Sequence, residues 1–164
     1  VIGFEESDGY LTGSYVRDKD GVDGAYMICE MFSYYATRGI SLLDKLDELY
    51  KTYGYCLNTL HSYEFDGSAG FAKMQSIMQA FRDDIKEFGG KKVIKLLDYA
   101  PGLDGLPKSD VLKFLLEDNC SIVVRPSGTE PKLKTYISVS AENKENAEKI
   151  EARIVEDAEK RLAC

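Results

Sequence analysis

The hydrophobic pattern of this 164-residue chain changes period near Tyr55, and this change limits its possible folds more than any other feature. Upstream of Tyr55, apolar side chains recur at steps of three and four residues, which is typical of amphipathic helices. From Tyr55 to Phe65 they alternate with more polar side chains, which predicts a long strand with one aromatic-rich face. The chain therefore combines helices and strands, and the segments before and after Tyr55 are predicted to belong to different units.

The segment before this change predicts two helices. Asp20 is a suitable N-cap for the first helix, and Ser41 with Asp44 forms a capping-box pattern at the start of the second. Each helix is followed by a glycine that can adopt the left-handed conformation. Residues 1–19 mix glycine with acidic residues after a short apolar start, which indicates the end of a buried strand and then a loop. Because the chain opens without an initiator methionine, we expect it to begin inside a longer protein.

The segment after the change predicts a sheet with helices on one face. The predicted order is strand 55–65, helix 68–88, strand 91–99, short helix 109–117, strand 121–124, strand 133–140 and helix 142–162. Four strands joined partly by hairpin-length loops predict an α+β fold with a four-stranded, mainly antiparallel sheet. Residues 1–54 do not fit this unit and are predicted to be the helical tail of a preceding α/β domain.

Charge and cysteine content narrow the class of protein. The formal net charge is -7, which argues against a nucleic-acid-binding surface, because such a surface normally needs a basic face. No apolar run approaches the roughly 20 residues that span a bilayer, so we expect no membrane segment. The four cysteines are widely spaced and form no C-x-x-C pair, which is typical of reduced thiols in a cytoplasmic protein without a zinc site.

The stretch RPSGTEP, between two predicted strands, concentrates donors for an anion. Arg125 carries a planar guanidinium suited to phosphate, and Ser127 and Thr129 add hydroxyl donors. Gly128 permits a positive φ and close backbone approach, so that successive amides near it can form a concave nest for oxygens. The residues alone leave an alternative open, in which the loop is a long hairpin whose Arg125 pairs with Glu130 at the surface.

RPSGTEP closely resembles the phosphate-binding loop in the last domain of the α-D-phosphohexomutases, the phosphoglucomutase and phosphomannomutase family. A second stretch, GFEESDGYL followed by VRDKDGV, resembles the sugar-binding loop of the family's third domain, G-x-E-x-S. The two motifs occur in the family's order and the resemblance covers essentially the whole chain. It implies that residues 1–54 are the C-terminal part of the third domain and that residues 55–164 are the C-terminal phosphate-binding domain.

The resemblance also implies roles for individual residues. The residues implied to contact sugar hydroxyls are Glu5 and Ser7, with Lys19 as a possible further substrate contact. The residues implied to bind the phosphate that is not being transferred are Arg125, Ser127, Gly128 and Thr129. Many phosphomannomutase-type members carry a histidine where this chain has Gly9, so the pattern favours the phosphoglucomutase branch. His61, the only histidine, is predicted to be structural.

The function implied for the full-length parent is that of a phosphoglucomutase. Such an enzyme interconverts glucose 1-phosphate and glucose 6-phosphate through glucose 1,6-bisphosphate and an enzyme phosphoserine, assisted by Mg²⁺. The family's serine loop and aspartate-rich metal loop do not occur in these 164 residues, so we expect this chain alone to be inactive and to hold no metal. Its expected partners are a phosphosugar and the missing N-terminal domains. The alternatives are a phosphomannomutase or related mutase, and a non-catalytic phospho-ligand-binding module.

Overall fold

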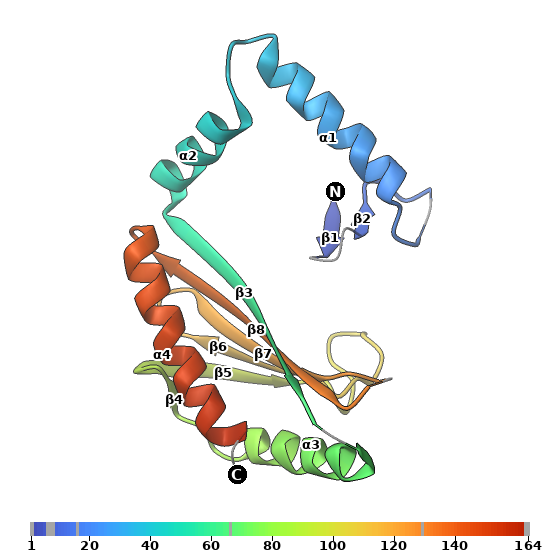
Figure 1. Ribbon diagram of the computed structural model, residues 1–164, viewed down its shortest axis with the longest axis vertical. Coiled ribbons are helices and arrows are strands. Elements are labelled where there is room, and N and C mark those ends of the chain that lie inside the picture. Colours follow the sequence, from blue (N-terminus) through green and yellow to red (C-terminus); the bar gives the residue numbers. More distant parts are fainter. Residues whose placement is uncertain (1, 6–8, 16, 66, 129, 163–164) are drawn as a thin grey trace. The chain divides into compact units, whose positions relative to one another are not determined.

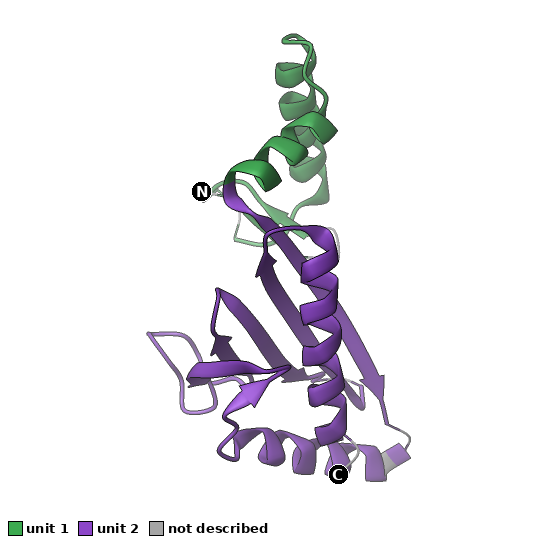
Figure 2. Ribbon diagram, turned by 90° about the vertical axis from the view of Figure 1, so that its left-hand side faces the viewer, with its two compact units in different colours: residues 1–52 green, residues 53–164 purple. Residues whose placement is uncertain are grey.

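The chain divides into two compact units, Val1–Thr52 and Tyr53–Cys164 (Figure 2). The structure, a computed structural model, describes residues 2–5, 9–15, 17–65, 67–128 and 130–162 (Figure 1). Within these residues, no helix is both long and apolar enough to cross a membrane.

The first unit contains a short hairpin and two helices. Strands β1 (Gly3–Glu5) and β2 (Gly9–Leu11) pair antiparallel, and helices α1 (Gly21–Ala36) and α2 (Leu42–Tyr53) follow. The buried strand predicted at the start of the chain is wrong, because β1 is an edge of this two-stranded hairpin and its Phe4 side chain is 78% exposed.

Both predicted helix starts are confirmed. The Asp20 carboxylate accepts from the amide of Val22 at 2.9 Å and from that of Asp23 at 3.2 Å. The Ser41 hydroxyl accepts from the amide of Asp44 at 3.0 Å, and the Asp44 carboxylate accepts in return from the Ser41 amide at 3.2 Å. These reciprocal bonds satisfy amides that the first turn of a helix leaves without intrahelical partners.

The apolar faces of α1 and α2 are largely exposed. In α1, Gly24 is the one buried residue among those described, and it leaves room for the Tyr10 ring, which a Cβ at this position would meet at 2.5 Å. In α2 no described residue is buried. The exposed large side chains of α1 and α2 include Val22, Tyr26, Phe32, Leu43 and Tyr53. An amphipathic helix normally buries such a face against a sheet or another helix.

The second unit is built on one antiparallel sheet. Within the described residues it has six strands in the order β3-β8-β7-β6-β5-β4, and every neighbouring pair is antiparallel. The strands are β3 (Tyr55–Glu64), β4 (Glu87–Phe88), β5 (Lys91–Asp98), β6 (Leu112–Leu116), β7 (Cys120–Pro126) and β8 (Lys132–Ala141). Helices α3 (Gly67–Arg82) and α4 (Lys144–Leu162) complete the unit (Figure 1).

The core lies between one face of this sheet and the two helices. Alternate residues of β6, β7 and β8 are buried, as the pleat of a half-covered sheet requires. They form one apolar cluster with residues of α3, including Met78 and Phe81, and residues of α4, including Ala147 and Ile154. The opposite face of the sheet carries the half-buried and exposed residues of the same strands.

The α+β fold with both helices on one face agrees with the prediction, but the predicted number of four strands is wrong. Residues 109–117, predicted as a short helix, contain strand β6 with the burial pattern of a strand. The helix predicted to reach Phe88 ends at Arg82, and Phe88 lies in strand β4. Phe88 remains fully buried and its ring packs edge-on against Phe114, with centroids 5.1 Å apart. Because Phe88 is buried from strand β4, it happens to continue the apolar spacing of α3, and this spacing made the predicted helix too long.

Candidate functional site

The RPSGTEP stretch forms the end of β7 and the turn that leads into β8 (Figure 1). Backbone hydrogen bonds hold both sides of this turn: the Ser127 amide donates to the Lys132 carbonyl at 2.7 Å, and the Phe65 amide donates to the Pro131 carbonyl at 2.9 Å. The Ser127 amide is thus part of the hairpin, which removes one donor from the predicted nest. Thr129, a predicted phosphate ligand, lies outside the described residues.

Arg125 stands near the end of β7 with an exposed side chain. Among the described residues, no carboxylate pairs with its guanidinium. Glu130, its alternative partner, lies instead 3.3 Å from Lys132 Nζ, which is also 3.1 Å from Glu64 Oε1. Hydrogen bonding to Glu64 and then to Glu130 raises the pKa of Lys132 above its ordinary value. The charge of Lys132 is therefore engaged by Glu64 and Glu130, whereas the guanidinium of Arg125 remains available.

Lys134 adds a second cation beside Arg125. The β7–β8 register places the two residues directly opposite each other, on the sheet face that the helices do not cover. Directly opposed side chains have Cβ atoms about 4.5–5.5 Å apart. A hollow of about 290 Å³ is lined by Arg125, Pro126, Ser127, Gly128 and Lys134. Sequence reasoning missed Lys134, because the strands predicted at 121–124 and 133–140 left Arg125 in the loop, whereas β7 continues to Pro126.

A second hollow, of about 370 Å³, shares the residues from Arg125 to Gly128. Its other lining residues come from α3 and from the segment before β6: Phe71, Met74, Gln75, Ser109 and Asp110. Asp110 is the one acidic residue in this lining, and its Oδ1 accepts from Arg82 Nη2 at 2.6 Å. The loop is thus flanked by two hollows, and the negative charge beside it is already paired.

In the first unit, the structure brings Glu5 and Lys19 together. Lys19 Nζ donates to Glu5 Oε1 at 2.5 Å, and both side chains are substantially exposed. Gly9 lies directly beside this pair, because a Cβ there would meet Lys19 Cδ at 2.5 Å and Glu5 Oε1 at 2.8 Å. Any side chain at position 9 would therefore have to displace the ion pair. Ser7, the other predicted sugar contact, lies outside the described residues.

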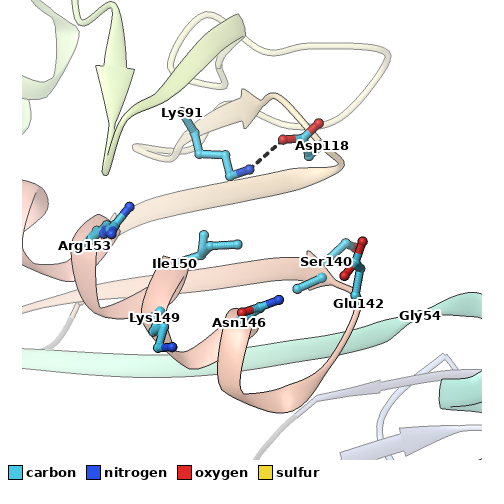
Figure 3. Close-up of a pocket in the computed structure, with 10 residues that line it drawn as sticks. Gly54, Lys91, Asp118, Ser140, Glu142, Asn146, Lys149, Ile150 and Arg153 are labelled. Carbon is cyan, nitrogen blue, oxygen red and sulfur yellow. Dashed lines mark hydrogen bonds and ion pairs between the residues drawn. The ribbon is translucent and has the colours of Figure 1, made fainter.

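A larger hollow, of about 700 Å³, lies at the other end of strands β7 and β8 (Figure 3). Its floor includes Ile150, and Lys91 Nζ lies 2.6 Å from Asp118 Oδ2 across one side. Lys149, from α4, is 2.6 Å from Glu145. Two of its cations are therefore already paired, and the hollow contains neither of the predicted motifs, so the RPSGTEP turn remains the better candidate for an anion site.

His61 contacts Glu151 and joins two elements of the second unit. His61 Nε2 and the Thr59 hydroxyl each lie 2.8 Å from Oε1 of Glu151, which joins β3 to α4. Within the described part of the chain, no group of three or more His, Cys, Asp or Glu residues could hold a metal ion.

Comparison with known proteins gives concordant results. The family model described as "Phosphoglucomutase/phosphomannomutase, C-terminal domain" matches residues 66–157. A phosphoglucomutase of Staphylococcus aureus (strain MSSA476) is 38% identical over 167 residues, which cover 94% of this chain and 30% of that protein. A phosphoglucomutase of Staphylococcus saprophyticus is 34% identical over 155 residues, which cover 87% of this chain and 28% of that protein. The chain thus spans about 30% of the length of these curated relatives.

A solved structure has a similar fold. The open form of the exocytosis-sensitive phosphoprotein pp63/parafusin, a phosphoglucomutase from Paramecium, aligns with a TM-score of 0.65 at 20% sequence identity. The alignment covers 96% of this chain and 29% of that chain. At this identity the match supports the fold alone.

Proposed function

Because the chain belongs to the phosphoglucomutase/phosphomannomutase family and contains its C-terminal domain, we propose that it is the C-terminal part of a phosphoglucomutase. The parent would interconvert glucose 1-phosphate and glucose 6-phosphate through glucose 1,6-bisphosphate and an enzyme phosphoserine. The relatives named phosphoglucomutase support an enzymatic parent. In this proposal the reacting serine and the magnesium loop belong to the preceding domains, and the present chain binds substrate without turning it over.

The observation that carries the proposal is the available guanidinium of Arg125, with Lys134 directly opposite and Ser127 beside the same hollow. Charge-assisted hydrogen bonds to a dianion are stronger than bonds between neutral groups, and a guanidinium matches phosphate geometry. A mutase must hold the unreacting phosphate in both orientations of the sugar. Such a site needs donors to a phosphate rather than contacts to one particular hydroxyl, and a guanidinium, an ammonium and a hydroxyl meet this need.

Glu5 and Lys19 are proposed to bind the sugar from the first unit. A carboxylate can accept from two vicinal hydroxyls, and the adjacent ammonium can donate. Gly9 stands where many phosphomannomutase-type members of the family carry a histidine, so this position and the relatives named phosphoglucomutase favour a glucose phosphate in this proposal. The proposal also assigns residues 1–54 to the family's third domain. The exposed apolar side chains of α1 and α2 support this assignment, because earlier segments of that domain would cover them.

The full-length parent tests this proposal. With glucose 1-phosphate, we expect Arg125→Ala to lower kcat/KM by about ten- to a hundredfold, the effect of losing a charged hydrogen bond of roughly 1.5–3 kcal/mol. Glu5→Gln should weaken phosphosugar binding and leave inorganic phosphate binding intact. Turnover of mannose 1-phosphate in preference to glucose 1-phosphate would contradict the assigned sugar, and unchanged kinetics of Arg125→Ala would remove the loop from the mechanism.

A further inference from the structure

Arg82 joins the two ends of the connection between β5 and β6. It is the last residue of α3, and its Nε donates to Asp98 Oδ2 at 2.9 Å while its Nη2 donates to Asp110 Oδ1 at 2.6 Å. Asp98 ends β5 and Asp110 precedes β6. One guanidinium therefore binds two carboxylates that are separated by a loop, in a partly buried position where its side chain is 22% exposed.

Asp110 lines the same 370 Å³ hollow as Arg125. A carboxylate and a guanidinium that face one hollow attract each other, and their pairing would compete with any anion for the guanidinium. The structure avoids this pairing, since the Asp110 carboxylate bonds to Arg82 and, among the described residues, Arg125 has no carboxylate partner. The state of Asp110 therefore bears on whether Arg125 is available.

We propose that Arg82 is a positioning residue for the phosphate site. By holding Asp110, it prevents this carboxylate from pairing with Arg125 and leaves the guanidinium free to bind phosphate. Arg82 itself does not line either hollow beside the loop, so its effect on binding is exerted through Asp110. The inference rests on the proposed function of the loop as a phosphate site.

The test measures the dissociation constant for inorganic phosphate of the 164-residue chain and its variants, by amide chemical shifts in the loop. Arg82→Gln should weaken phosphate binding about two- to fivefold, the factor that a partly exposed ion pair supplies. Asp110→Asn alone should leave binding equal or tighten it up to about threefold, because the competing charge is removed and the charge of Arg82 is less compensated. The double variant should bind phosphate as well as the wild type.

A matched control is Lys91→Gln, which releases Asp118 from an ion pair at the other end of the sheet and should leave phosphate binding unchanged. Equal weakening in Arg82→Gln and in the double variant would show that Arg82 only maintains the fold, and would overturn the inference. Unchanged phosphate binding in Arg82→Gln would also overturn the inference. Weaker phosphate binding in Asp110→Asn would overturn it as well, and this variant tests the inference even if Arg82→Gln fails to fold. Failure of the wild type to bind phosphate would overturn the proposed function, and the inference with it.

Discussion

Replacing Phe114 by alanine tests the strand β6 that sequence patterns did not reveal. Phe114 is 1% exposed and packs against two other rings of the core. Its ring centroid is 5.1 Å from that of Phe88 and 6.3 Å from that of Phe81. Because β6 pairs with β7, which carries Arg125, this packing also supports the strand that positions the proposed phosphate site.

Truncating a buried phenylalanine costs about 3–5 kcal/mol of the free energy of unfolding. We expect the upper part of this range for Phe114→Ala, because each aromatic neighbour adds about 0.5–1.5 kcal/mol beyond area burial. With a slope of about 2 kcal/mol per molar urea, a loss of about 4–5 kcal/mol lowers the unfolding midpoint by about 2–2.5 M. Urea titration followed by circular dichroism measures this midpoint.

Lys113→Ala is the matched control, because Lys113 is the preceding residue on the other face of β6 and is only half-buried. Its replacement should change the free energy of unfolding by no more than about 0.5 kcal/mol. Equal midpoints for the two variants, or a loss below about 1 kcal/mol for Phe114→Ala, would refute the assignment of this segment to a core strand.

Two further predictions concern buried or half-buried carboxylates that bond to other elements. The pKa of Asp98 lies below its ordinary value of 3.8, chiefly because its carboxylate accepts from the Arg82 guanidinium and also because it accepts from the Ala100 amide. Asp98 therefore stabilises the fold above pH 3.8, and this contribution is lost as the pH falls through the lowered pKa. Asp98→Asn should therefore reduce the acid dependence of the midpoint below about pH 4, and an unchanged acid limb would contradict this. Glu151→Ala leaves the Thr59 hydroxyl and His61 without their acceptor and should cost about 1–3 kcal/mol in the same titration; a stability equal to wild type would refute that role.

Local signals predicted the elements whose ends and faces are set by their own residues. The caps at Asp20 and Ser41 form the predicted hydrogen bonds because a cap involves neighbours in sequence. The alternation that begins at Tyr55 gives the strand β3, whose alternate residues are half-buried. In these segments the local preference for a helix or a strand agrees with the burial in the fold, so the sequence pattern predicts the element correctly.

The failures occur where tertiary contacts outweigh local preference. The short helix predicted at 109–117 does not form, because the Ser109 amide donates to the Tyr99 carbonyl at 3.0 Å and the following residues enter the sheet. Helix α3 ends at Arg82, but the apolar spacing continues to Phe88 because Phe88, in strand β4, is also part of the core. In the candidate site, Arg125 was predicted from its residue chemistry and from the resemblance of RPSGTEP to a family motif. The contact between Arg82 and Asp110 joins distant segments, and no local pattern predicts such a contact.

The most direct test of the whole account is the binding of inorganic phosphate to the isotope-labelled 164-residue chain, read at the backbone amides. We predict saturable shifts at Arg125, Ser127, Gly128 and Lys134 that disappear in Arg125→Ala, whereas residues around Lys91, at the other end of the sheet, stay unchanged. Shifts that persist in Arg125→Ala, or that appear around Lys91 instead, would contradict a phosphate site in the β7–β8 turn.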